Sequence, residues 1–194
     1  MPEPLIGNHL ALDFLNTAYG ADVRVETIAD GRAYLDWLVA AGALDRTTSS
    51  RLLRRFGSKV MDVAAADARQ LREWARNWLA RWRMAPGTSF KRELAELDTM
   101  LARGRWCYRL VADGSSYRFA HEPCIDSADS LLAVPARWIA DLLVEADPSR
   151  IRSCGGAGCT LWFVDRSKPH RRVFCSTRTC GNRHKVAAFR ERQP

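Results

Sequence analysis

Hydrophobic residues recur every three to four positions in several segments of this chain, which is the pattern of helices that bury one face. The longest segment covers residues 59–84 and places Trp74, Trp78 and Trp82 on its apolar stripe. Shorter segments cover residues 31–41, 47–56, 89–102 and 130–146. The pattern predicts about five helices. Because the tryptophans continue an aliphatic stripe, we expect them in the core rather than stacked on nucleic-acid bases.

The periodicity changes after residue 104. Residues 105–112 and 115–121 are rich in β-favouring residues and flank Asp113-Gly114, a dipeptide typical of hairpin turns. Residues 10–15 are apolar over too short a run to distinguish a helix from a strand. The predicted fold class is therefore α+β, with a mainly helical N-terminal domain that includes a small antiparallel sheet.

Charge divides the chain near residue 150. The 194 residues carry a net charge of +8, and their hydrophobic content of 47% excludes wholesale disorder. Residues 1–150 hold 20 basic and 20 acidic residues, whereas residues 151–194 hold ten basic residues and only Asp165 and Glu191 as acids. This asymmetry predicts a neutral body, 1–150, and a basic module, 151–194, that binds a polyanion. The alternative is a solubilising tail.

Export and membrane segments are not expected. The longest run without a charged residue has 12 members, Ser153 to Val164, which is too short to cross a bilayer. The N-terminus lacks the basic start and apolar stretch of a signal peptide. These observations favour a reducing cytoplasm, where clustered cysteines bind metal more often than they form disulfides.

Four cysteines in the basic module form the pattern Cys-x4-Cys-x15-Cys-x4-Cys: Cys154, Cys159, Cys175 and Cys180. Two close pairs of thiolates joined by a loop suit a tetrahedral metal ion, and four sulfur ligands that close the shell favour one structural zinc. Two disulfides or four unrelated thiols are the alternative. His170 and His184 lie nearby but are not needed as ligands. The remaining cysteines, Cys107 and Cys124, are expected to be isolated buried thiols.

The residues around these cysteines predict a small finger. Residues 160–164 favour a strand, and residues 171–174 are expected to return antiparallel to it. Residues 181–190 are expected to form a helix that turns Val186 and Phe189 inward. The predicted module is thus a hairpin followed by a basic helix, whose N-terminal amides favour phosphate.

The C-terminal module resembles the CGNR zinc finger of bacterial proteins. The resemblance includes Cys180-Gly181-Asn182-Arg183, both cysteine pairs, Leu161-Trp162-Phe163 and Asp165-Arg166-Ser167. The body resembles the ABATE domain, starting with the run from Leu10 to Thr17. The resemblance implies a transcription regulator of a stress response whose finger binds DNA, with the four cysteines as zinc ligands. It gives no role to Asn182 or Arg183. We expect Asn182 to hydrogen-bond the second cysteine pair, and Arg183 to pair with Asp165 or with a phosphate.

DNA binding is the first functional hypothesis. The candidate contacts are Arg166, Arg171, Arg172, Arg178, Arg183, Lys185 and Arg190. The alternative is that the finger binds RNA or a protein partner. An enzyme is not expected, because four cysteines leave no open metal position and no phosphate-loop or nucleophile motif is present.

The body is expected to act as a sensor or a homodimerisation domain. Asp13, Asn16 and Thr17 are polar residues among apolar neighbours, which makes them candidates for a pocket that binds a small-molecule effector. In the alternative interpretation, Asp13 and Asn16 only cap or cross-link the fold.

Overall fold

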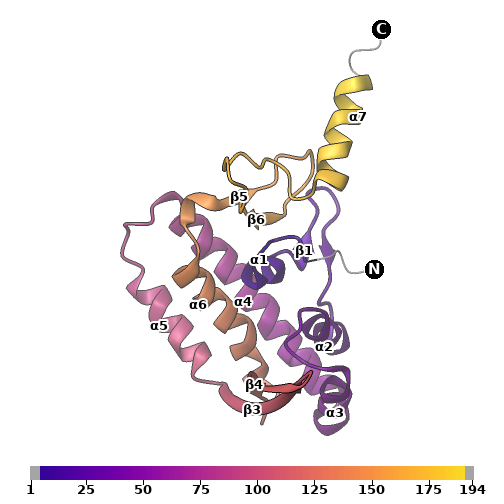
Figure 1. The fold of residues 1–194 in the computed structure, drawn as a ribbon, viewed down its shortest axis with the longest axis vertical. Helices are drawn as coiled ribbons and strands as arrows, with labels where there is room; N and C mark the ends of the chain where they lie inside the picture. The colour runs from indigo at the N-terminus through magenta and orange to yellow at the C-terminus, as the bar shows by residue number, and fades with distance from the viewer. Residues whose placement is uncertain (1–4, 191–194) are drawn as a thin grey trace. The chain divides into compact units, whose positions relative to one another are not determined.

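A computed structural model describes residues 5–190 of the chain (Figure 1). Contacts divide these residues into two compact units. The finger unit comprises residues 5–27, 72–89 and 138–190, and the hairpin unit comprises residues 28–71 and 90–137. The helices α4 (Ser58–Met84) and α6 (Ala133–Glu145) contribute residues to both units. The finger unit thus combines segments from both sides of residue 150.

The hairpin unit contains α2 (Gly31–Ala40), α3 (Arg46–Phe56), α5 (Lys91–Leu101) and the N-terminal part of α4. Asp30 and Asp45 cap α2 and α3 by accepting backbone hydrogen bonds from Ala33 and Thr48. A β-carbon on Gly31 would lie 2.3 Å from the β-carbon of Met61, so α2 can approach α4 this closely only with glycine.

The stripe predicted for α4 is shifted at its N-terminal end. Val60 and Val63 are exposed, whereas Met61 and Ala65 are buried. From Ala68 onward the aliphatic positions of the predicted stripe are buried. Of its three tryptophans only Trp78 is buried in the core, whereas Trp74 and Trp82 are half-buried. None of the described helices, including the 27-residue α4, combines the length and the apolar composition needed to cross a bilayer.

The predicted hairpin consists of β3 (Arg105–Asp113) and β4 (Ser116–Cys124), which pair antiparallel from Arg105↔Cys124 to Asp113↔Ser116. Gly114 has a φ of 61° in the turn, where glycine is favoured. A turn at Asp129–Leu132 leads into α6, and Pro135 lies in the first turn of that helix.

The prediction that Cys107 and Cys124 are isolated buried thiols is wrong. The register of β3 and β4 places them next to each other across the strands, with Cα atoms 5.9 Å apart, and their sulfur atoms form a disulfide. Cys107 is exposed and Cys124 is half-buried. The two cysteines are 17 residues apart in the sequence, and only the register of the two strands brings them together, so their proximity could not be predicted from the spacing.

The six cysteines should therefore show two classes of reactivity. In reduced, zinc-loaded protein, a thiol reagent should modify the exposed Cys107 and the half-buried Cys124 faster than the four cysteines of the finger, because metal-bound thiolates react slowly. Mass spectrometry of the labelled peptides measures this. Mild oxidation before labelling should join these two cysteines in the disulfide and so prevent the reagent from modifying them. Equal labelling of all six cysteines with zinc bound would contradict the assignment.

The finger unit contains α1 (Leu10–Leu15), β1 (Ala18–Tyr19), β2 (Val25–Glu26), β5 (Ile151–Ser153), β6 (Trp162–Val164) and α7 (Asn182–Arg190), together with the C-terminal part of α4 and most of α6. The short run at residues 10–15 is thus a helix, capped by His9, which accepts from the Ala11 amide. The segments β1 and β2 form a two-stranded antiparallel pair. The mainly helical fold with small antiparallel sheets, followed by a finger with strands and a helix, confirms the predicted α+β class.

Two details of the predicted finger are wrong. The strand β6 pairs antiparallel with β5, which precedes the first cysteine, and residues 171–174 do not form a strand. They meet the first cysteine turn instead, where the Gly155 amide donates to the Val173 carbonyl over 2.9 Å. In addition, Val186 and Phe189 are exposed, because α7 buries none of its residues.

Candidate metal centre and nucleic-acid interface

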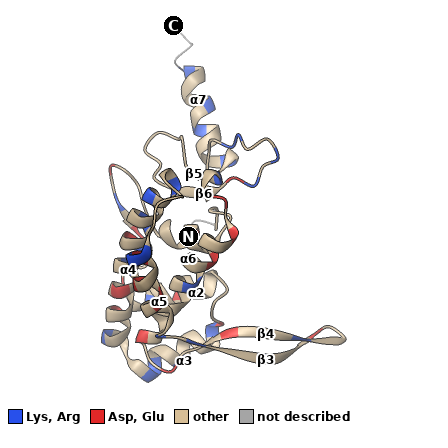
Figure 2. Ribbon diagram, turned by 90° about the vertical axis from the view of Figure 1, so that its left-hand side faces the viewer, with Lys and Arg blue, Asp and Glu red and all other residues tan. Residues whose placement is uncertain are grey.

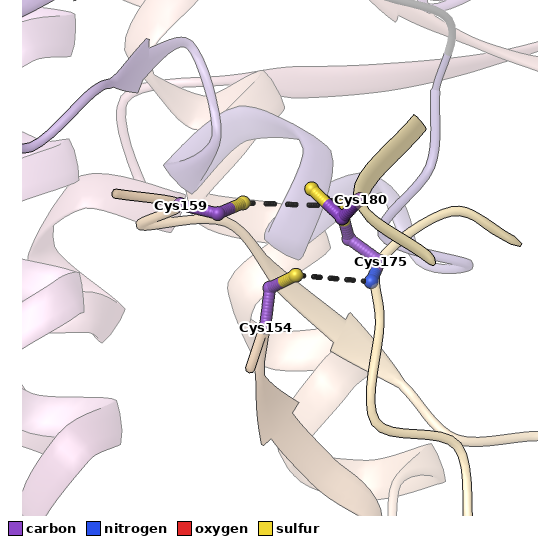
Figure 3. A group of neighbouring side chains, drawn as sticks. All are labelled: Cys154, Cys159, Cys175 and Cys180. Atoms are coloured by element: carbon purple, nitrogen blue, oxygen red, sulfur yellow. Dashed lines mark hydrogen bonds between the residues drawn. The ribbon is translucent and has the colours of Figure 1, made fainter. Parts of the chain in front are cut away.

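The four cysteines of the finger reach one point from three short segments. Cys154 follows β5, Cys159 ends a turn in which Gly158 has a φ of 67°, and Cys180 lies in the helical turn Thr177–Gly181. Their sulfur atoms and that of Cys175 all lie within 4.8 Å of one another (Figure 3). The Cys175 sulfur is 3.6 Å from that of Cys180 and 3.9 Å from that of Cys159.

This geometry fits a zinc ion. Tetrahedral zinc with sulfur ligands at about 2.3 Å separates the sulfurs by about 3.8 Å, close to the two distances above. Four protein thiolates also close the coordination shell, as structural zinc sites do. Among the described residues, this is the one group of histidines, cysteines and carboxylates that could hold a metal, and His170 and His184 are not part of it.

At two of the four cysteines the surroundings oppose ionisation of the thiol unless a cation is bound. Burial raises the pKa of Cys159 to about 11 and also raises that of Cys175. A zinc ion supplies the positive charge that such thiols need to ionise. The Cys154 sulfur accepts from the backbone amides of Cys175 and Gly156 over 3.3 and 3.4 Å. Gly156 must stay small, since an added β-carbon would lie 3.2 Å from the Cys180 sulfur.

Arg172 supports the metal centre from one side. Its guanidinium lies 4.3 Å from the ring centre of Phe163, a fully buried residue packed with the cysteines. It donates to the carbonyl of Phe174 over 2.9 Å and also to the carbonyl of Cys175. These contacts occupy the guanidinium of Arg172 within the finger.

Asp165 fixes the loop that follows β6. Its buried carboxylate accepts from the amide and hydroxyl of Ser167, over 2.9 and 2.6 Å, and from the Arg172 amide over 3.0 Å. The hydrogen bond from the Ser167 hydroxyl is the main reason that the pKa of Asp165 is lowered. Asp165 therefore does not pair with Arg183, contrary to one of our expectations. The sequence could not show that three donors within seven residues satisfy this acid.

The finger is joined to the N-terminal segment along the free edge of β6. The Asn16 side chain donates to the Trp162 carbonyl and accepts from the Trp162 amide, both over 2.8 Å. The Val164 amide donates to the Gly7 carbonyl over 2.8 Å, and Asn8 donates to the Val164 carbonyl over 3.0 Å. The N-terminal segment thus takes the place of a third strand beside β6.

Two arginines of α4 also hold the finger. Arg83 lies 4.8 Å from the ring centre of Trp162 and donates to the Ser153 hydroxyl over 3.0 Å. Arg76 donates to the carbonyls of Thr160 and Leu15 over 3.3 and 2.7 Å. The finger therefore contacts both α4 and the loop around α1. None of these contacts was predicted, although arginines beside a tryptophan stripe could have indicated such a role.

The three polar residues of the predicted effector pocket have partners inside the protein. Asn16 binds Trp162, as described, and the Thr17 hydroxyl accepts from Arg72 over 2.9 Å. Asp13 accepts from the Gly7 amide over 2.7 Å, and burial raises its pKa. Asp13 lines a cavity of about 430 Å³ that also includes Asp141 and Arg166. The contacts of Asp13 and Asn16 correspond to the cross-linking alternative.

Removing the Asn16 side chain should loosen the finger from its support. In Asn16→Ala, the buried amide and carbonyl of Trp162 lose their partners, which we expect to destabilise the finger unit by about 3 kcal/mol. Chemical denaturation measures the loss, and hydrogen exchange should show a less protected Trp162 amide. The exposed Asn77 of α4 offers a matched control, and Asn77→Ala should change stability by less than about 0.5 kcal/mol. Equal effects of the two variants would contradict the docking role of Asn16.

The basic residues of the finger are mostly exposed, and Figure 2 marks their positions along the chain in blue. The exposed ones among those predicted to contact DNA are Arg166, Arg171, Arg178, Arg183, Lys185 and Arg190. Arg166 differs from the others because it lines a cavity with His9 and Glu145. Asn182 begins α7 and is exposed, and in the described chain its side chain makes no hydrogen bond to the cysteine turn, contrary to expectation.

Comparison with protein families agrees with this architecture. Residues 150–193 match the model of the CGNR zinc finger. Residues 8–146 match the ABATE model, whose description is "Putative stress-induced transcription regulator". A search of curated proteins finds no match. The two family matches confirm the resemblance inferred from the cysteine pairs and from the run at residues 10–17.

Proposed function

We propose, from the premise that this chain belongs to the ABATE family and ends in a CGNR zinc finger, that it is a zinc-dependent DNA-binding regulator of transcription in a stress response. The four-cysteine centre supports the zinc dependence, because it organises the segment that would meet DNA. Its closed shell offers no position for a substrate, so we propose no catalysis there.

The placement of α7 carries the proposal. This helix begins two residues after the ligand Cys180 and buries none of its residues. It contacts the finger through the ring of His184, 5.1 Å from that of Phe174, and most of its side chains are exposed. It carries Arg183, Lys185 and Arg190, all exposed. An α-helix fits the major groove of duplex DNA, and basic side chains along it can neutralise phosphates on both sides.

The proposed DNA surface consists of α7 and the turn before it, with Arg171, Arg178, Arg183, Lys185 and Arg190 as contacts. Arg172 is excluded because its guanidinium holds the finger together. Phosphate contacts of this kind give affinity and orientation but little sequence readout. A single short helix reads few bases, so we expect modest specificity for one copy of the chain.

One observation favours RNA or a protein partner as the second candidate. Phe189 is exposed on α7 between the basic side chains, where it could stack on an unpaired base or pack against a protein. Competition between duplex DNA and single-stranded RNA for the purified protein separates the candidates. Displacement by RNA at lower concentration than by duplex DNA would favour the alternative.

Genome-wide mapping of the bound protein tests the regulatory role. The wild-type chain should enrich discrete sites upstream of genes, and the double variant Cys175→Ser, Cys180→Ser should lose them at equal protein level. If both proteins give the same profile, or neither enriches any site, the proposed role is wrong.

A further inference from the structure

The two faces of the hairpin formed by β3 and β4 differ sharply. One face carries charged residues and the Cys107–Cys124 disulfide, and includes the ion pairs Arg109–Glu122 and Arg118–Asp113. The other face is formed by alternate positions and is uncharged apart from one histidine. Its members, hereafter the aromatic face, are Trp106, Tyr108, Leu110, Ala112, Tyr117, Phe119, His121 and Pro123.

Most of the aromatic face is open to solvent. The exposed fractions are 72% for Tyr108, 64% for Leu110, 75% for Tyr117 and 72% for Phe119. Figure 2 shows the outer part of the hairpin extending away from α2 and α3 of the same unit. The side chains are ordered among themselves: the rings of Tyr108 and His121 stack at 4.6 Å, and that of Phe119 meets Tyr108 edge-on at 6.2 Å.

A two-stranded sheet whose apolar face is exposed to water gains little stability from its own contacts. Two-stranded hairpins are marginally stable in water, and a sheet gains stability when its apolar face is covered. In the described chain neither strand has a third strand beside it, so nothing extends the sheet. A contiguous exposed patch of aromatic and aliphatic side chains of this kind marks an interaction site.

We propose that the aromatic face is covered by the aromatic face of a second copy of this chain, which makes the protein a homodimer. The aromatic face has no acidic residue, lysine or arginine, so it can pack against its own copy without like-charge repulsion. Two copies related by a two-fold axis present the same patch to each other, which is the usual geometry of homodimers.

The exposed apolar area of the face is also large enough for a specific interface. The four most exposed side chains offer about 500 Å² per copy at the areas typical of large apolar side chains. A symmetric pair would then bury about 1,000 Å², the minimum for a specific interface, before Trp106, His121 and the strand edges are included. Central aromatic side chains are also the residues that contribute most to the affinity of such interfaces.

This inference does not rest on DNA binding and can fail or succeed independently of it. If both hold, the dimer would carry two copies of α7 and could bind two half-sites, which would compensate for the limited readout of one finger.

Sedimentation velocity over a concentration series, without nucleic acid and with reductant present, tests the proposal. The wild-type chain should sediment as a dimer, and Phe119→Lys should weaken dimerisation at least about 100-fold, because each interface would then bury two unpaired ammonium groups. The matched control is Val63→Lys, at an exposed valine of α4 in the same unit, which should leave the dimer intact.

Folding of the variant must be checked separately. Phe119→Ile keeps a β-favouring apolar side chain and should retain most of the dimer, so it distinguishes loss of the interface from loss of the hairpin. Circular dichroism of all variants should match that of the wild type. A wild-type chain that stays monomeric, or a dimer that persists in a folded Phe119→Lys variant, would overturn the proposal; the face would in the first case belong to a different protein.

Discussion

Removal of zinc is expected to unfold residues 151–190 while the hairpin unit keeps its structure. Binding of a structural zinc to a small finger is worth about 10–16 kcal/mol at neutral pH, and this binding energy is largely the folding energy of the finger. In this chain three of the four cysteines, Cys154, Cys175 and Cys180, form a buried cluster of the finger with Leu161 and Phe163. The melting temperature of the finger unit should fall by about 10 °C or more on chelation.

Hydrogen exchange separates the two units in one experiment. After chelation, the Gly155 amide, which donates to Val173, and the Trp162 amide, which donates to Asn16, should lose protection. Amides within α2 serve as the internal control and should stay protected. Metal analysis comes first, and fewer than about 0.5 zinc per chain in the purified protein would remove the basis of this expectation. An unchanged melting temperature after verified removal of zinc would contradict it.

Neutralising the basic residues of α7 is expected to weaken DNA binding and its dependence on salt. Each phosphate contact contributes about 0.9 to the slope of log affinity against log salt concentration. The triple variant Arg183→Ala, Lys185→Ala, Arg190→Ala should therefore reduce the magnitude of the slope by about 2 to 3. Its stability should hardly change, because all three residues are exposed. Fluorescence anisotropy of a labelled duplex at several salt concentrations measures the slope.

A charge-matched control is available in the hairpin unit. Arg32, Arg46 and Lys91 are exposed, and their replacement by alanine removes the same charge from another part of the chain. This control should leave the salt slope nearly unchanged. If both triple variants reduce the slope equally, binding follows net charge and α7 is not the contact surface.

The metal centre could be predicted from the sequence because each pair of its ligands lies within a few residues of chain. Cys154 and Cys159, like the second pair, lie five positions apart, and a tight turn is enough to place two thiols together. The helix α7 and the β3–β4 hairpin were predictable for the same reason, since a basic helical run and an Asp-Gly turn act over a few residues.

The contacts that support the centre could not be predicted, because they join residues far apart in the chain. Asn16 and Trp162 are separated by 146 residues, and no pattern near either one indicates the other. The strand β6 could pair with the segment before it or with the segment after it. The prediction chose residues 171–174, whereas the structure pairs β6 with β5. Charge alone also could not separate Arg172, which is bound within the finger, from Arg183, which is exposed on α7.

These long-range contacts refine the division suggested by charge. The family matches meet between residues 146 and 150, whereas the finger unit includes the N-terminal segment and part of α4 with the finger. Asn16, near the start of the ABATE region, and Arg76 and Arg83 of α4 thus bind the basic module to that region. The finger is supported by the body rather than attached only through a linker.

Titration of a labelled DNA duplex with zinc-loaded, chelated and zinc-restored protein tests the central claim most directly. The account predicts binding by the zinc-loaded chain, loss of that binding after chelation, and recovery when one equivalent of zinc is returned. Binding that survives complete removal of zinc, or a zinc-loaded chain that binds no duplex at low salt, would contradict it.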